Sequence, residues 1–242
     1  MRSKLSVGAE IIQGGQVVKT DFKDLEDRYL HNISVPNCEL DTRSKLLEAA
    51  VKVFSKYGYD GASLRQISDL AGVKHGLIKY HHKNKNTLWQ AVVTFLYDMM
   101  LNALEWDDQV GDKILNADGF RNHMISMTRA YIRFSAKYPE LFRILMFEIL
   151  LESERLDWVV ENFSKPLIKK SMIRIHQGKA AGIFPKNVSD MNVFYIMMTA
   201  NRTIFLLAPE VKRTFGVDVF SEQELQQHED AIIEMIYRYL RP

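Results

Sequence analysis

The feature that most constrains this chain is an apolar stripe with a helical period that begins shortly after Asp41. Apolar side chains recur every three or four residues over positions 46–57, which predicts an amphipathic helix. Asp41 or Thr42 is suited to cap the start of this helix, and Gly58 is suited to end it. Such a helix has to bury its stripe, so neighbouring segments must supply a partner for it.

The residues after Gly58 predict two more helices, both short and separated by a sharp turn. Ser63 and Gln66 have the Ser-x-x-Gln spacing of a capping box, which opens a helix running to Leu70. Ala71-Gly72 supplies the turn, because glycine adopts a positive φ without strain. A third helix is predicted over residues 74–81. This order is typical of the helix-turn-helix, whose second short helix enters the major groove of DNA.

Positive charge is concentrated in the same part of the chain. Residues 41–88 contain nine Lys or Arg and four Asp or Glu, a net charge of +5. The whole chain carries a formal net charge of +2, so the remaining residues carry −3. Such a focused positive field indicates a polyanionic partner. The alternative is a basic but merely solvated helical surface.

The rest of the chain also has a helical pattern, and its composition favours an all-α fold. The 242 residues include only 12 Gly and 6 Pro, and 47% are hydrophobic. A long helix capped by Asn84 is predicted to carry the chain into a larger helical domain. Further helices are predicted over residues 120–137, 141–150, 155–181, 187–207 and 221–240. We expect Pro166 to break or kink the third of these near Phe163, and Pro209 to stop the fourth.

Residues 1–40 show no helical period, so we expect a flexible N-terminal extension. Within it, residues 11–13 face residues 16–18 across Gly14-Gly15, which is the pattern of a β-hairpin with a two-residue turn. An isolated hairpin is marginally stable at best, which favours the flexible alternative.

Several classes of protein are disfavoured by the sequence. Cys38 is the only cysteine, which excludes an intrachain disulfide framework and suits a reducing cytoplasm. No signal peptide is visible, and the apolar run at 193–207 is interrupted by Asn201 and Arg202 and falls short of the ~20 residues of a membrane span. We find no Gly-rich phosphate loop, metal-ligand spacing or nucleophile–base signature, so we expect neither an enzyme nor a cofactor.

One long string resembles the N-terminal domain of the TetR family of transcription regulators. It reads Ala62-Ser-Leu-Arg-Gln-Ile-Ser-Asp-Leu-Ala-Gly-Val-Lys-His-Gly-Leu-Ile-Lys-Tyr-His-His-Lys-Asn-Lys85, and the resemblance extends over residues 43–96. It implies a cytoplasmic bacterial regulator, in most cases a repressor, that binds a pseudo-palindromic DNA operator as a homodimer and responds to a small-molecule effector. On this basis residues 41–88 form the DNA-binding domain and residues 89–242 the ligand-binding and dimerisation domain.

The resemblance also assigns candidate DNA-binding residues. They are Ser63, Arg65, Lys74, His75, Leu77, Lys79, Tyr80, His81 and Lys85. Family members use the start of the first short helix and the end of the second for phosphates, and the front of the second helix for base edges. Helix N-termini bind anions for general physical reasons, which agrees with the first of these roles.

Two positions depart from the family pattern. Position 79 is usually aromatic and position 82 usually apolar, but here they are Lys79 and His82. Lys79 would exchange packing for charge, which raises affinity for any DNA. His82 is interpreted as a half-buried substitute for an aromatic residue, and the alternatives are a titrating switch or a phosphate ligand.

The second half offers candidates for effector binding and for dimerisation. By the resemblance, the last two helices pair with those of a second copy. Candidate effector-binding residues are Met127, Phe142, Met146, Glu148, Trp158, Asn201 and Arg202. Each of them has a plain alternative in core packing or, for the polar ones, in internal pairing. A purely structural helical protein is the remaining rival, but it would leave the basic cluster unused.

Overall fold

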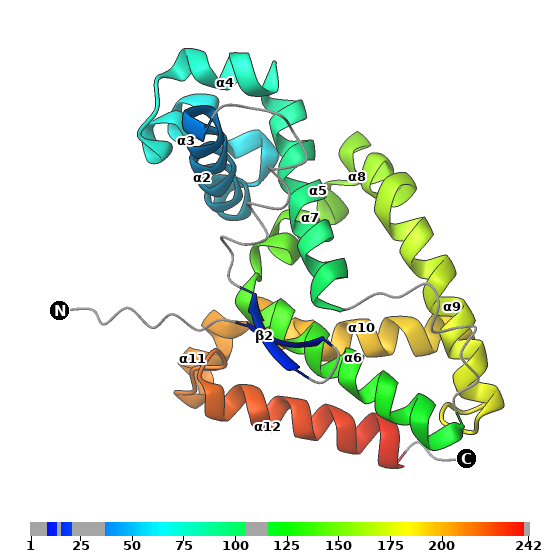
Figure 1. The fold of residues 1–242 in the computed structure, drawn as a ribbon. Coiled ribbons are helices and arrows are strands. Elements are labelled where there is room, and N and C mark those ends of the chain that lie inside the picture. The colour runs from blue at the N-terminus through cyan, green and yellow to red at the C-terminus, as the bar shows by residue number, and fades with distance from the viewer. Residues whose placement is uncertain (1–8, 14–15, 21–36, 105–115, 240–242) are drawn as a thin grey trace. The chain divides into compact units, whose positions relative to one another are not determined.

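The computed structural model describes residues 9–13, 16–20, 37–104 and 116–239, and the chain divides into two compact units, Met1–Met99 and Met100–Pro242 (Figure 1). The fold is all-α apart from one hairpin near the N-terminus, which confirms the predicted fold class. The boundary between the units lies after Met99, within the helix Lys85–Ala103. The sequence placed the boundary earlier, after residue 88. None of the described helices is long and apolar enough to cross a membrane.

The hairpin pairs β1 (Ala9–Gln13) with β2 (Gln16–Thr20) in antiparallel register. Ile11 lies opposite Val18 and Ile12 opposite Val17, which is the register that the sequence pattern predicted. The two glycines of the predicted turn lie outside the described residues.

The helices of the first unit are α2 (Asn37–Gly61), α3 (Leu64–Ala71), α4 (His75–His82) and α5 (Lys85–Ala103), the last of which continues into the second unit. Gly58 has φ 66° and ψ −178°, so the regular part of α2 stops at this residue, as predicted. The predicted start was wrong, because α2 begins at Asn37 and neither Asp41 nor Thr42 caps it.

The predicted caps of α3 and α5 are confirmed. At α3, Gln66 N donates to Ser63 Oγ at 3.1 Å, and Ser63 N donates to Gln66 Oε1 at 2.8 Å. This reciprocal pair is a complete capping box. At α5, Thr87 N donates to Asn84 Oδ1 at 2.9 Å.

The core of the first unit is formed by apolar residues from all of these helices. The fully buried ones include Leu46, Ala50, Phe54, Ile67, Ile78, Leu88, Trp89, Val92 and Val93. The stripe on α2 therefore finds the partner it needs within the same unit.

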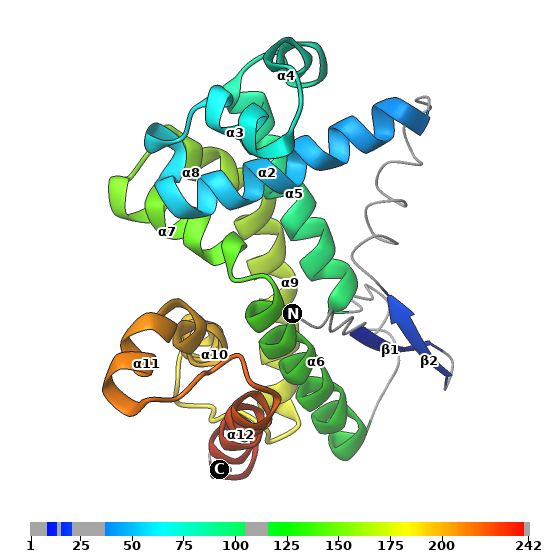
Figure 2. The ribbon, with the colours of Figure 1, turned by 90° about the vertical axis from the view of Figure 1, so that its left-hand side faces the viewer.

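The second unit contains α6 (Ala117–Lys137), α7 (Glu140–Leu151), α8 (Glu154–Val159), α9 (Lys165–Ala180), α10 (Asp190–Leu206), α11 (Ala208–Phe215) and α12 (Glu222–Ile233). Two π-helical segments, Val160–Ser164 and Glu234–Tyr239, follow α8 and α12. In Figures 1 and 2, α6 lies against α9, α10 and α12, and α11 lies beside α10.

The break predicted near Phe163 takes the form of the π-helical segment Val160–Ser164. Pro166 lies in the first turn of α9 and has no N–H to donate to the carbonyl of residue 162. The chain widens to π geometry just before the proline and so keeps running in the same direction.

In the region from 187 to 209 the predicted start of the helix was wrong and its predicted end is confirmed. The helix begins after the cap Ser189, whose Oγ accepts from Asn192 N at 3.2 Å, rather than at Asn187. The helix ends at Leu206, just before Pro209, as predicted, but the proline does not end helical structure in the chain. Instead the proline occupies the first turn of α11, where no intrahelical N–H bond is required.

A buried carboxylate ties α6 to α12. Glu229 is completely buried and forms ion pairs with Arg129 at 2.8 Å and Arg133 at 2.7 Å, both on α6. Close by, Tyr237 Oη lies 2.8 Å from Thr128 Oγ1. The apolar core of the unit surrounds these contacts and includes Phe120, Ile132, Ile175, Phe184, Phe194, Phe205 and Ile232.

Gly178 tests how tightly this core is packed. A Cβ atom there would lie 2.5 Å and 2.7 Å from two ring carbons of Phe184, whose side chain is 1% exposed and has no room to move away. We predict that Gly178→Ala lowers the free energy of unfolding by about 1–3 kcal/mol, as overpacking does. Gly76→Ala is the matched control, because no atom lies within 4 Å of its Cβ position. Chemical denaturation followed by circular dichroism measures both, and an unchanged midpoint for Gly178→Ala would contradict the packing described here.

Candidate DNA-binding surface and ligand cavity

The turn between α3 and α4 is built from one glycine and two backbone hydrogen bonds. Gly72 has φ 67° and ψ 30°, and its N–H donates to the Asp69 carbonyl at 3.3 Å. The Val73 N–H donates to the Ser68 carbonyl at 3.1 Å. This is how a helix ends at a left-handed residue, and it confirms the turn predicted at Ala71-Gly72.

The inner faces of the two short helices are fixed by apolar packing. Ile67 of α3 and Ile78 of α4 are completely buried, and the two helices pack against each other. His82 lies one turn after Ile78 and is 5% exposed. Because residues four apart share one face of a helix, these two define the buried side of α4 and leave the rest of it to solvent.

All nine predicted DNA-binding residues remain accessible in the first unit. Those classed as exposed are Ser63, Arg65, Lys74, His75, Leu77, Lys79 and Tyr80. His81 and Lys85 are half-buried. None of the nine is classed as buried, so each side chain leaves surface that a partner can contact.

The start of α3 combines free backbone donors with a cation. The Ser63 hydroxyl caps the helix, and the Arg65 side chain is 87% exposed, 3.9 Å from Asp69. Helix N-termini attract anions through their unbonded N–H groups. A phosphate placed here would meet both features.

The exposed side of α4 carries aromatic rings among basic groups. Tyr80 is 70% exposed, and its ring meets the edge of the His81 ring at 5.0 Å. Lys79 beside it is exposed, so the charge at this position replaces no core contact. Both rings and cations contact the sugar-phosphate backbone well.

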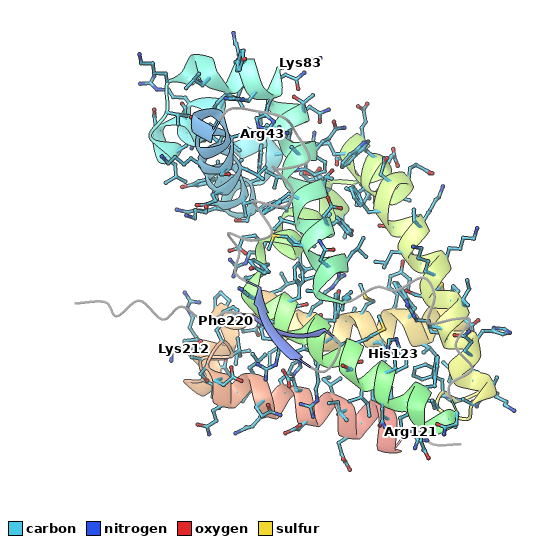
Figure 3. All side chains as sticks on the ribbon, in the orientation of Figure 1. Arg43, Lys83, Arg121, His123, Lys212 and Phe220 are labelled. Carbon is cyan, nitrogen blue, oxygen red and sulfur yellow. The ribbon has the colours of Figure 1, made fainter. Side chains whose placement is uncertain are left out.

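Lys85, at the start of α5, is held in place by an aromatic ring. Its Nζ lies 4.4 Å from the centroid of the Tyr59 ring, which is a cation–π arrangement. Lys83, which we did not select from the sequence, is exposed at the end of α4 and adopts φ 52° (Figure 3). It was present in the charge count, and its place directly after the second short helix was the signal that would have found it.

His82 is buried more completely than expected, and its electrostatics identify it as a packing residue. Desolvation, followed by the charges of Arg43 and His81, lowers the pKa of His82 from 6.5 to about 4. Its Nε2 atom has no hydrogen-bond partner among the described residues. The ring is therefore neutral near pH 7 and is too buried to bind a phosphate.

The second unit contains a cavity of about 100 Å³ between α6, α9 and α10, and Met100 and Leu104 also line it. Five of its lining residues are methionines: Met100, Met124, Met127, Met197 and Met198. Its polar lining residues are Thr128, Tyr131, Ser171, Arg174 and Asn201. Most of these side chains are themselves buried, so the cavity belongs to the interior of the unit.

Only two of the seven predicted effector-binding residues, Met127 and Asn201, line this cavity. Phe142 and Arg202 form a separate pair, with the Arg202 guanidinium 4.6 Å from the centre of the ring. Met146 is 37% exposed on α7.

The other two predicted residues have internal partners. Glu148 is buried and accepts hydrogen bonds from Arg155 Nε at 2.9 Å and from the Ser153 hydroxyl. Trp158 packs edge-on against Phe163 at 5.4 Å. The alternative of internal pairing therefore describes Glu148.

The cavity residue that sequence reasoning missed is Arg174, which is 8% exposed. A signal was present, because Leu167, Ser171 and Arg174 follow the i, i+4, i+7 spacing of one helix face. Tyr131 was also missed. Its hydroxyl accepts from Arg202 Nη1 at 3.4 Å.

A second hollow, of about 400 Å³, lies beside α11 and is lined by residues of α10, α11 and α12. Its wall includes Phe215, which is 74% exposed. Phe220, marked in Figure 3, stacks on Phe205 near it, with ring centroids 5.9 Å apart.

The two sides of α10 differ in burial. Phe194 and Asn201 are buried and line the cavity. Met191, Tyr195 and Ile196 of the same helix do not line the cavity and are 60%, 52% and 55% exposed. Large apolar side chains exposed close together mark a surface suited to a protein partner.

The burial of His82 predicts how stability depends on pH. Because its pKa is lower in the folded than in the unfolded chain, the neutral ring stabilises the fold above pH 6.5, and this stabilisation is lost as pH falls toward 4. We expect a loss of about 2–3 kcal/mol between pH 7 and pH 4.5 that is absent in His82→Phe. His81→Phe, the control at a half-buried position, should retain the loss. Denaturation at both pH values measures it, and identical pH dependence in wild type and His82→Phe would refute the assignment.

Each of the two units matches a known protein family. The family model described as "Bacterial regulatory proteins, tetR family" matches residues 46–92, and the family model described as "Tetracyclin repressor-like, C-terminal domain" matches residues 121–236. The HTH-type transcriptional regulator RutR of Escherichia coli K12 is 25% identical over 210 residues, covering 83% of this chain and 91% of that protein. TtgR of Pseudomonas putida is 38% identical over 73 residues, 29% of this chain and 35% of that protein.

Solved structures share the fold. The ketosteroid transcriptional regulator KstR2 of Mycobacterium tuberculosis superposes with a TM-score of 0.60 at 20% identity, covering 81% of this chain and 95% of that one. AibR in complex with isovaleryl coenzyme A and operator DNA superposes with a TM-score of 0.60 at 16% identity, covering 81% and 98%. With both family models matched in chain order and the helix-turn-helix in place, this protein belongs to the TetR family of bacterial helix-turn-helix transcriptional regulators.

Proposed function

We propose that this protein is a ligand-responsive repressor that binds a pseudo-palindromic operator as a homodimer, with α4 in the major groove. The observation that carries the proposal is the accessible basic face of α3 and α4, whose opposite side is packed by Ile67 and Ile78. A helix-turn-helix arranged in this way reads DNA through its second helix. Because it acts on chromosomal DNA, the proposal places the protein in the cytoplasm.

The residues divide into those that hold the backbone and those that read bases. Ser63 and Arg65 at the start of α3, and Lys85 at the start of α5, meet phosphates, because helix N-termini and cations lie together there. Lys79, Tyr80 and His81 contact the sugar-phosphate backbone from the end of α4. Lys74, His75 and Leu77, at the front of α4, contact base edges, and the Leu77 side chain suits a thymine methyl group.

The partner surface is the exposed side of α10. Met191, Tyr195 and Ile196 on α10, together with Met235 in the π-helical segment after α12, expose 52–64% of their surface. Covering them with the same face of a second copy gives a two-fold dimer through the last long helices. Such a dimer presents two copies of α4 to half-sites about one DNA turn, ~34 Å, apart.

The effector site is the cavity between α6, α9 and α10. It combines an apolar, methionine-rich wall with a few polar groups, which is the usual make-up of a small-molecule site. Of the residues selected from the sequence, we retain Met127 and Asn201 for this role. AibR, which shares the fold, was solved with both isovaleryl coenzyme A and operator DNA. We propose the same coupling of ligand and DNA here.

The division of roles predicts two different DNA-binding defects. Lys85→Ala removes a phosphate contact, so it should weaken all DNA equally and flatten the dependence of log affinity on log salt by about one unit. His75→Ala should leave nonspecific affinity unchanged but relax base preference, with a loss of about 1–3 kcal/mol on the preferred site. Lys169→Ala is the control, because Lys169 is an exposed lysine on α9, outside the DNA-binding unit. Fluorescence anisotropy with an operator selected from random DNA measures these effects, and indifference of both variants would refute the proposed groove contacts.

A charge on the exposed side of α10 should prevent dimerisation. In Tyr195→Glu, a carboxylate would be buried against its own copy across the two-fold axis, so we expect monomers at micromolar concentration. Ile173→Glu on α9 replaces a residue that is 54% exposed and is expected to stay dimeric. Light scattering measures both. A monomeric wild-type protein, or a dimeric Tyr195→Glu variant, would contradict this interface.

A further inference from the structure

The cavity between α6, α9 and α10 has a polar side as well as an apolar one, and the polar side indicates what kind of molecule fits. Arg174 of α9 and Asn201 of α10 both line the cavity and are 8% and 4% exposed. Two strongly polar side chains so deeply buried are costly to keep unless their hydrogen-bonding groups are used. They stand out in a wall that is otherwise built from Met, Leu, Ile, Phe and small hydroxyl residues.

Asn201 has unused hydrogen-bonding capacity. Its Oδ1 atom is buried and has no hydrogen-bond partner among the described residues. A carboxamide has donors on one side and an acceptor on the other, and a half-turn about its last bond exchanges them. The unsatisfied position therefore suits either a donor or an acceptor of a bound molecule.

Arg174 indicates that the bound molecule presents an acceptor rather than a donor. A guanidinium is permanently charged and carries five N–H donors, so it can keep an interaction within the protein and still donate to a ligand in the cavity. Its planar fork matches a carboxylate better than any neutral group. The hydroxyls of Thr128 and Ser171 are already used, by Tyr237 and by the carbonyl of Leu167, so they compete little for the ligand head.

The size of the cavity limits the rest of the molecule. Its volume of about 100 Å³ is smaller than the about 150 Å³ of an engineered cavity that binds benzene. The five methionines can change rotamer to enlarge it slightly. A short aliphatic chain fits, a single ring fits once methionine side chains move, and a polycyclic body does not fit.

We infer that the effector is a small monocarboxylate with an apolar body, whose carboxylate is bound by Arg174 and Asn201 and whose body lies among the methionines. This rests on the proposed role of the cavity as the effector site, and it adds the chemical class of the effector. The carboxylate accepts from the Arg174 guanidinium and, with the amide turned, from Asn201 Nδ2. Both contacts form away from bulk water, where charge-assisted hydrogen bonds are strongest.

The test compares acids with neutral molecules of the same shape on the full-length protein. Isothermal titration calorimetry with pentanoate and benzoate, against pentanamide and benzamide, should show the carboxylates binding at least tenfold more tightly. Arg174→Gln should weaken carboxylate binding at least tenfold and leave amide binding unchanged. Arg174→Lys keeps the charge but loses the fork, so it should lie between wild type and Arg174→Gln. Lys169→Gln, an exposed cation on the same helix, should bind as wild type does, and thermal melts establish that each variant is folded.

Three results would overturn the inference, and they differ in what they say about the proposed function. Amides that bind as tightly as the acids would leave a responsive cavity with a neutral effector. A folded Arg174→Gln variant with unchanged carboxylate affinity would leave a responsive cavity in which Arg174 does not hold the carboxylate. Failure of all four compounds to bind or to release operator DNA, in a protein that still binds its operator as a dimer, would overturn the carboxylate assignment while DNA binding stands.

Discussion

The second unit depends on a carboxylate that has been removed from water. Glu229 is completely buried on α12, and two arginines from α6 lie within 2.8 Å of it. A buried charge with its partners in place is tolerated, but one that has lost a partner costs several kcal/mol, so this cluster strongly disfavours any other alignment of α6 and α12. The hydrogen bond between Thr128 and Tyr237 uses the same alignment. Since α6 also forms a wall of the cavity, the ion cluster sets the position of that wall as well.

The first unit relies on packing and caps instead of buried charge. Its two short helices are too short to be stable alone, and α3 is secured at its start by the capping box and at its end by the turn at Gly72. Ile67 and Ile78 bury the inner faces of the two helices. His82 adds a ring that stays neutral because burial disfavours its charged form. All the strongly basic groups are thereby left on the outside. The unit presents charge to DNA because none of that charge is needed to hold it together.

Prediction from sequence succeeded where structure is determined over a few neighbouring residues. The capping box at Ser63, the cap at Asn84 and the left-handed turn at Gly72 each depend on contacts within four residues, and all were correct. It was incomplete where one local signal has two consequences. Pro209 marks the end of α10 as predicted, but a proline also suits the first turn of a new helix, which is how α11 begins.

The cavity was harder still, because its lining comes from helices far apart in the chain. Glu148 and Arg174 are both charged residues on helices that also carry core residues, and nothing in their local sequence says which of them lies at the cavity. The structure pairs Glu148 with Arg155 and places Arg174 at the cavity. Tertiary packing, rather than periodicity, makes this distinction.

The two unlike sides of α10 carry a thermodynamic consequence. One helix contributes Asn201 to the proposed effector site and Tyr195 to the proposed dimer interface, so a shift or rotation of this single rigid element changes both surfaces together. The free energy of effector binding and the free energy of dimerisation are therefore coupled, and this coupling is reciprocal. Whatever amount the effector adds to or removes from self-association, self-association adds to or removes from effector affinity. The sensitivity of such a regulator to its signal then varies with its own abundance in the cell.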